Sequence, residues 1–152
     1  MNSATLVEDR KTTVTPSHID TKEQRIGLRL DRLFTKEGVH PYDAVKWHRR
    51  IARITNDKGG LLFEQKDIEM PDFWSQMATD VIASKYFHGK NGTPEREGSL
   101  KQLIDRVVNT IAAWGREDGY FATPEDCDIF AAELTHLLLN QYASFNSPVW
   151  FN

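Results

Sequence analysis

Two residues at helical spacing are of the types that bind metal ions. Glu133 and His136 have the Glu-x-x-His spacing with which helices of di-iron carboxylate proteins supply metal ligands. Such a centre also needs a second pair and two further carboxylates from facing helices, and no second helical copy accompanies this one. Because half a site cannot complete a metal coordination shell, we interpret the pair as solvated or hydrogen-bonded and predict no metal site.

Cys127 is the only cysteine of the chain and a candidate nucleophile or radical carrier. Its neighbours Asp126 and Asp128 disfavour a thiolate, whereas its place in the first turn of a predicted helix favours one. It also falls on the apolar stripe of that helix, where a free cysteine behaves as a small hydrophobic residue. We therefore interpret Cys127 as buried and structural. A single cysteine excludes an internal disulfide framework and indicates a reducing compartment.

Basic and aromatic residues mix between Lys46 and Arg53, as they do on surfaces that bind single-stranded nucleic acid. The formal net charge is -3, however, so no basic field would attract nucleic acid or an anionic membrane. We interpret the stretch as the solvated face of a strand and predict no nucleic-acid partner. Trp74, Tyr86 and Trp114 suggest a ligand pocket, but aromatic residues at helical spacing are far more often part of a core.

Hydropathy gives no sign of a membrane partner or of export. No apolar stretch approaches the roughly 20 residues that cross a bilayer, and residues 1–20 lack the basic-then-apolar pattern of a secretory signal. We therefore predict a cytoplasmic protein. Residues 1–25 are polar and charged without a sustained apolar period, which predicts a disordered arm.

The elements that would position the candidate residues begin with a β-hairpin. Two strand-like runs, Val45–Ile54 and Leu61–Pro71, flank the turn residues Asn56–Gly60. Further along, residues 90–98 contain chain breakers and charges but no apolar side chain, which predicts an exposed loop.

Three amphipathic helices are predicted after Pro71, and their apolar stripes are expected to pack against one another as the core. The N-terminal signals are Asp72 as N-cap of the first, a Ser99–Gln102 capping box for the second, and Thr123 followed by Pro124 for the third. Gly115 and Gly119 are predicted to end the second helix. The apolar stripes are Phe73, Trp74, Met77, Val81, Ile82 and Tyr86; Leu100, Leu103, Ile104, Val107, Val108, Ile111 and Trp114; and Cys127, Phe130, Leu134, Leu137, Leu138 and Tyr142.

The terminal segment Phe145–Asn152 has the pattern of a turn followed by a strand, with Pro148 in the first strand position. An unpaired strand of Val, Trp and Phe would expose an apolar edge, so we expect the polypeptide to continue or another chain to complete the sheet. The predicted fold is α+β and mainly helical. It comprises the arm over 1–25, a domain over 26–144 with a small β element and a three-helix core, and a terminal strand over 145–152.

Several strings in one order along the chain carry a family resemblance. They are Arg32–Gly38, Pro41–Asp43, Phe63–Asp67, Pro71–Gln76, Ala83–Phe87, Trp114–Tyr120, Glu133–His136 and Phe145–Asn152. Together they resemble the N-terminal portion of the adenosylcobalamin-dependent, or class II, ribonucleotide reductases, and the last string is the most diagnostic. The resemblance covers roughly residues 29–152.

The resemblance implies a ribonucleoside-diphosphate reductase that makes deoxyribonucleotides for DNA synthesis. In this family adenosylcobalamin generates a thiyl radical inside a ten-stranded α/β barrel, and a cysteine pair, recharged by a thioredoxin-type reductant, supplies electrons. The N-terminal segment packs beside the barrel, and residues 145–152 resemble the start of it. These strings leave open diphosphate and triphosphate substrates, the allosteric nucleotides and the oligomeric state.

One functional residue is implied at a matched position. Ser147 resembles the serine that contacts the phosphate of the ribonucleotide substrate, against the alternative of a turn residue satisfied by its own backbone. The catalytic cysteines of the family have no match here, and Cys127 corresponds to none of them. We therefore expect the chain alone to be inactive and to support the barrel, present in cis or as a separate chain. The alternative is a freestanding, non-catalytic interaction or regulatory subunit that completes a separately encoded reductase.

Overall fold

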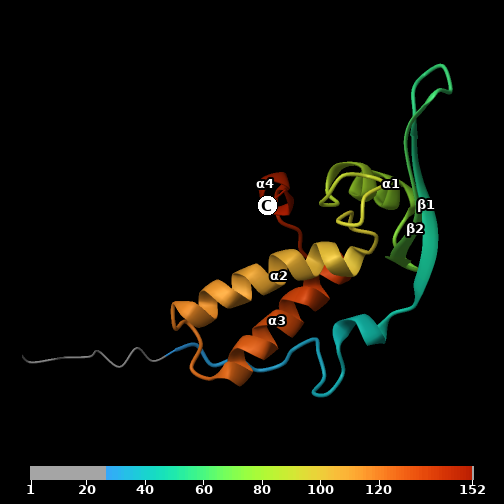
Figure 1. Cartoon of the computed structure of the whole chain (residues 1–152). Helices are drawn as coiled ribbons and strands as arrows, with labels where there is room; N and C mark the ends of the chain where they lie inside the picture. Colours follow the sequence, from blue (N-terminus) through green and yellow to red (C-terminus); the bar gives the residue numbers. More distant parts are fainter. Residues whose placement is uncertain (1–26, 152) are drawn as a thin grey trace, which may run out of the picture.

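The computed structural model describes residues 27–151, which form an α+β fold of one two-stranded antiparallel sheet with helices (Figure 1). The elements are η1 (Pro41–Ala44), β1 (Trp47–Thr55), β2 (Leu61–Pro71), α1 (Gln76–Lys85), α2 (Leu100–Glu117), α3 (Pro124–Leu139) and α4 (Ser147–Trp150). Within this part of the chain, no helix is long and apolar enough to cross a membrane. The arm predicted over residues 1–25 lies outside the described residues.

The predicted hairpin is confirmed, and Asn56 determines its turn. The Asn56 side-chain oxygen accepts hydrogen bonds from the backbone N–H groups of Lys58 and Gly60, at 3.0 and 2.7 Å. Gly59 has a φ of +80°, a conformation that costs glycine little. The hairpin projects away from the helices in Figure 1, while Ala52, Ile68 and other residues nearer its base are fully buried.

The first helix begins later than predicted. Ser75, not Asp72, is its N-cap, and the Ser75 hydroxyl accepts a hydrogen bond from the Ala78 N–H at 3.0 Å. The Asp72 carboxylate instead pairs with His48 at 2.9 Å. The fully buried residues of the helix, Thr79 and Ala83, lie outside the predicted apolar stripe, and only half of that stripe packs against the core. Of the predicted apolar stripe, the exposed members are Phe73, Met77 and Val81, and the partly buried members are Trp74, Ile82 and Tyr86.

The predicted three-helix core is therefore wrong in part. Helices α2 and α3 pack along each other, but α1 packs mainly on the hairpin. The hydrophobic core joins both layers: Ile68 and Met70 of β2 lie in one cluster with Leu100 and Ile104 of α2 and Leu139 of α3. A small sheet face thus takes the place that the prediction gave to a third helix.

Residues 90–98 form a loop as predicted, but the loop is not simply exposed. Its Arg96 reaches inward to the C-terminal end of α1, donating hydrogen bonds to the backbone carbonyls of Ala83, Phe87 and Gly89. Because the last carbonyls of a helix have no partner within it, the guanidinium satisfies groups that burial would otherwise leave unpaired. Glu97 is also buried, at 7% exposure.

The second and third helices have most of the predicted signals. The Ser99 hydroxyl caps α2, but Gln102 accepts from Gly98 rather than from Ser99, so the reciprocal capping box is not formed. The prediction that Gly115 ends α2 is wrong: the residue lies inside the helix, at a position where a Cβ would approach the Phe121 ring to 2.5 Å. The Thr123 cap of α3 is confirmed, with Pro124 in the first turn.

An extended segment before η1 runs along α3 (Figure 1). Leu28 pairs with the turn between α2 and α3, its N–H donating to the Tyr120 carbonyl at 2.7 Å. Further on, the Leu30 N–H donates to the Asp126 carboxylate at 2.8 Å. The segment is therefore attached to the helices mainly by polar contacts to its backbone.

The strand predicted over 145–152 is wrong. Residues Ser147–Trp150 form the short helix α4, and Pro148 occupies a position in its first turn, where a missing N–H costs nothing. The local pattern of Pro followed by Val, Trp and Phe is compatible with a strand as well as with a short helix. Here α4 lies above α2 (Figure 1), and its Trp150 ring packs against the Phe145 ring, with centroids 5.8 Å apart.

The Arg96 contacts generate a stability prediction. Replacing Arg96→Lys should lower the free energy of unfolding by about 2–4 kcal/mol, because a single ammonium group cannot reach all the carbonyls that the guanidinium now satisfies. Urea denaturation followed by circular dichroism measures the loss. The matched control is Arg53→Lys, whose side chain is 59% exposed and pairs with Glu64 at the surface; it should cost under about 1 kcal/mol. Equal losses for the two variants would contradict this assignment.

Candidate functional site

Ser147, the predicted substrate contact, lies at the start of α4 with an exposed side chain. Its hydroxyl is 3.0 Å from the hydroxyl of Tyr86, which follows the end of α1. The partner of the Ser147 hydroxyl in the structure is thus a side chain from a distant segment. The two hydroxyls come from segments 61 residues apart, so tertiary packing alone brings them together.

Tyr86 holds the C-terminal segment at a second point. Its ring stacks on that of Phe151, with centroids 5.3 Å apart and planes inclined by 13°. The sequence predicts Tyr86 as part of a helical core stripe; in the structure it packs against the core while half-buried, and it also contacts the C-terminal segment. No local pattern distinguishes these two roles, because both place an aromatic residue near the end of an amphipathic helix.

A buried ion pair also contacts the segments that carry Tyr86 and Ser147. The Arg106 Nε donates to the Glu97 carboxylate at 2.8 Å, and the side chains are only 20% and 9% exposed. Arg106 also donates to the carbonyl of Trp150 in α4, at 3.1 Å, and to the carbonyl of Tyr86, at 3.2 Å. Sequence reasoning missed both charged residues, since Glu97 sat in a predicted exposed loop and Arg106 between apolar positions of α2.

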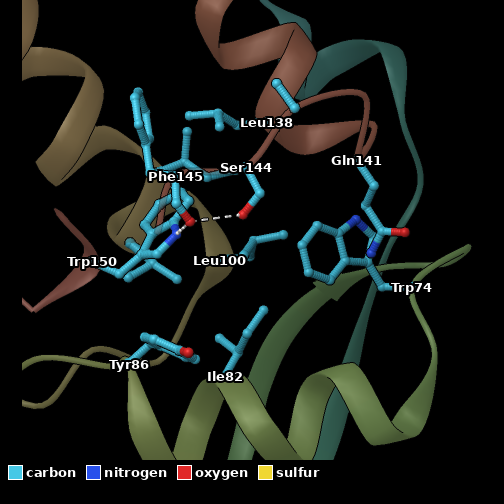
Figure 2. Close-up of a pocket in the computed structure, with 12 residues that line it drawn as sticks. Trp74, Ile82, Tyr86, Leu100, Leu138, Gln141, Ser144, Phe145 and Trp150 are labelled. Atoms are coloured by element: carbon cyan, nitrogen blue, oxygen red, sulfur yellow. Dashed lines mark hydrogen bonds between the residues drawn. The ribbon is translucent and has the colours of Figure 1, made fainter. Parts of the chain in front are cut away.

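A cavity of about 340 Å³ lies between α1, α2, the end of α3 and the C-terminal segment. Figure 2 shows Trp74 and Tyr86 on different sides of it, with Trp150 near Tyr86. The polar groups in its lining are few, and two indole N–H groups are already bonded: Trp74 to the Leu139 carbonyl at 2.8 Å and Trp150 to the Phe145 carbonyl at 2.9 Å. Of the three aromatic residues that the sequence suggested for a pocket, Trp114 does not line this cavity and is 60% exposed.

Glu133 and His136 do not form part of a metal centre among the residues that the structure describes, where no group of three metal-ligating side chains occurs. Instead the Glu133 carboxylate accepts hydrogen bonds from the backbone N–H groups of residues 33–35 and from the Thr35 hydroxyl, the last at 2.5 Å. His136 stacks on the Phe34 ring, with centroids 5.4 Å apart. The pair therefore attaches the extended segment to α3.

The prediction that Cys127 is buried is confirmed, because its side chain is 1% exposed. Its thiol lies 3.5 Å from the Ala112 carbonyl of α2, and the Arg116 guanidinium is 3.4 Å from the sulfur. A buried thiol against a helix backbone packs α3 on α2 and presents no surface to a substrate.

The basic stretch of β1 is confirmed as a largely exposed strand face, and several of its charges are engaged within the chain. Arg53 pairs with Glu64 at 2.6 Å, and Arg49 donates to the Asp67 carbonyl at 2.7 Å. Arg50 is half-buried and donates to backbone carbonyls between β2 and α1. These contacts hold the hairpin to α1 and give no support to a nucleic-acid surface.

Comparisons with known proteins agree on one family. The family model described as class II vitamin B12-dependent ribonucleotide reductase matches residues 48–141. A vitamin B12-dependent ribonucleotide reductase of Streptomyces clavuligerus is 55% identical over 127 residues, covering 83% of this chain and 13% of the relative. Its counterpart in Rhodopirellula baltica is 50% identical over 130 residues, which cover 84% of this chain and 12% of the relative. The chain therefore spans about one-eighth of the length of these relatives.

The Glu133 contacts generate a prediction of pH-dependent stability. Burial acts to raise the pKa of this carboxyl, but the hydrogen bonds from Thr35, Phe34 and Leu33 outweigh it and lower the pKa below its ordinary value. A lowered folded-state pKa means that the ionised carboxylate stabilises the fold above the unfolded-state pKa, and that this stability is lost as pH falls through the folded-state pKa. Glu133→Gln should therefore cost about 1–3 kcal/mol at neutral pH, and the cost should shrink below about pH 4.

Urea denaturation at pH 7 and pH 3 measures this difference. The matched control is Glu125→Gln, an exposed position in the first turn of the same helix, which should change stability little at either pH. A Glu133→Gln cost that stays constant across the pH range would show that packing, not the carboxylate charge, holds the extended segment.

Proposed function

Because the chain belongs to the class II vitamin B12-dependent ribonucleotide reductase family, we propose that it forms the N-terminal part of a complete reductase and supports its catalytic barrel. The observation that carries this proposal is the coverage: identity of 50–55% extends over most of this chain but over only about one-eighth of the relatives. The reaction would then be an oxidoreductase step that converts ribonucleoside diphosphates to deoxyribonucleotides in the cytoplasm. The remaining seven-eighths would supply the catalytic centre.

The cysteine count supports a non-catalytic role for this segment. The reaction proposed for the complete enzyme uses one cysteine as a thiyl radical and a further pair as the reductant of the substrate, with a thioredoxin-type protein to recharge the pair. This chain has one cysteine, and its thiol is buried against α2. Three thiols are needed and one inaccessible thiol is present, so the radical chemistry belongs to the rest of the enzyme.

The described residues do not fit the cofactor of the family. Cobalamin, proposed in its adenosyl form for the complete enzyme, is far larger than a drug-sized ligand, whereas the cavity of about 340 Å³ is near the lower end of drug-sized sites, which begin at about 300 Å³. The cavity is lined mostly by apolar side chains and lies between packed helices. We therefore assign cobalamin binding to the rest of the enzyme.

Within this role, we propose Ser147 as a contact to the substrate phosphate. A hydroxyl can donate to a phosphate oxygen, and the Ser147 side chain is exposed on a segment that packs against α1 and α2. Phosphate contacts orient a nucleotide without reading its base. Ser147 would thus orient ribonucleotides of any base at the edge of the barrel.

The isolated chain is expected to be inactive. Purified residues 1–152, supplied with adenosylcobalamin, a dithiol and cytidine 5′-diphosphate or 5′-triphosphate, should form no deoxycytidine nucleotide, because the thiols needed are missing. Product analysis by chromatography measures this, with the complete reductase as positive control. Turnover that co-purifies with the chain would contradict the proposal that the rest of the enzyme supplies the catalytic centre.

The proposed phosphate contact of Ser147 can be tested in the complete reductase. Ser147→Ala should weaken binding of the nucleotide substrate about tenfold or more, since a hydrogen bond to a charged group contributes about 1.5–3 kcal/mol. Equilibrium binding of the cytidine nucleotides measures the dissociation constant. Ser144→Ala is the matched control, because Ser144 is exposed on the same segment and bonds only locally, to the Phe145 carbonyl. An unchanged constant for Ser147→Ala would remove the proposed contact.

A further inference from the structure

Tyr86 contacts both ends of the short helix that carries Ser147. Its hydroxyl lies 3.0 Å from the Ser147 hydroxyl at the first residue of α4. Its ring stacks on Phe151, the residue that ends the helix, with a centroid distance of 5.3 Å. A helix of four residues has little stability of its own, so its orientation depends on such contacts from outside.

The backbone of Tyr86 is itself held in place. Its N–H donates to the Ile82 carbonyl at 2.9 Å, which closes the last turn of α1. Its carbonyl accepts from Arg106 at 3.2 Å, and the same guanidinium donates to the Trp150 carbonyl of α4. Arg106 therefore links the Tyr86 backbone directly to α4.

We propose that Tyr86 is a positioning residue that orients the Ser147 hydroxyl toward the substrate phosphate. The inference rests on the proposed role of Ser147. It adds a direction to the contact: ionised phosphate oxygens only accept hydrogen bonds, so the Ser147 hydroxyl must donate to the phosphate. Its oxygen is then available to accept, and the Tyr86 hydroxyl is the donor.

Two consequences follow from this direction. In the complex the Tyr86 hydroxyl donates to the Ser147 oxygen while the Ser147 proton goes to the phosphate, and the 3.0 Å contact already holds the Ser147 oxygen in place before the nucleotide arrives. In addition, hydrogen bonds in a chain polarise one another, so donation from Tyr86 makes Ser147 a stronger donor. Tyr86 itself need not touch the nucleotide.

Tyr86→Phe in the complete reductase tests the proposal, because it removes only the hydroxyl and keeps the ring against Phe151. Binding of cytidine 5′-diphosphate, and in a separate arm the 5′-triphosphate, should weaken about three- to tenfold, as expected for one lost hydrogen bond. The decisive measurement is the double variant with Ser147→Ala. Because Tyr86 acts only through Ser147, Tyr86→Phe should cause no further loss in that background.

The controls separate this proposal from the one on which it rests. Tyr120→Phe alters an exposed tyrosine in the turn between α2 and α3 and should leave binding unchanged, while Ser147→Thr, which keeps a hydroxyl, should retain the sensitivity to Tyr86→Phe. If Ser147→Ala weakens binding but Tyr86→Phe does not, the positioning role is wrong and the phosphate contact stands. If the losses of Tyr86→Phe and Ser147→Ala simply add, Tyr86 acts by another route and the proposal fails. If Ser147→Ala has no effect, the phosphate contact itself is wrong.

Discussion

The buried pair of Arg106 and Glu97 is the interaction on which the C-terminal half of the structure depends. Removing two charges from water is costly, and the cost is offset only where the remaining donors and acceptors are satisfied. Here they are: the Glu97 carboxylate also accepts from the His88 N–H at 2.7 Å, and Arg106 donates to the Tyr86 and Trp150 carbonyls. One pair thus joins α2, the end of α1, the following loop and α4 around the proposed site.

Hydrogen bonds from charged side chains to backbone groups also hold other parts of the chain. Arg96 satisfies the carbonyls at the end of α1, Glu133 collects the N–H groups of the extended segment, and the Asp126 carboxylate accepts from the Leu30 N–H at 2.8 Å. In each case a charged side chain bonds to backbone that no helix or strand satisfies. The irregular segments are therefore held by polar contacts, while the apolar core lies between the hairpin base, α2 and α3.

Helix α1 shows how this arrangement departs from amphipathic packing. Its inward face is small and partly polar, with Thr79 and Ala83 fully buried against the hairpin, while Met77 and Val81 are 75% and 43% exposed. Small residues allow the helix to approach the strands closely, and Arg50 joins the two through the Thr79 hydroxyl and nearby carbonyls. Hydrophobic periodicity alone identifies a helix there, but it misses Thr79 and Ala83, and only Trp74, Ile82 and Tyr86 of the predicted stripe pack against the core.

The sequence by itself determined the hairpin, the three longer helices, the burial of Cys127 and the family. These depend on signals within a few residues, such as the Asn56 turn and the Thr123 cap, or on strings that a family shares. It could not determine the face that α1 buries, the helical form of residues 147–150, or the contacts of Arg106 and Tyr86. Those depend on partners far apart in sequence, up to 61 residues for Tyr86 and Ser147. Only the packed chain decides them, because a short segment with no strong local preference adopts the conformation that its neighbours stabilise.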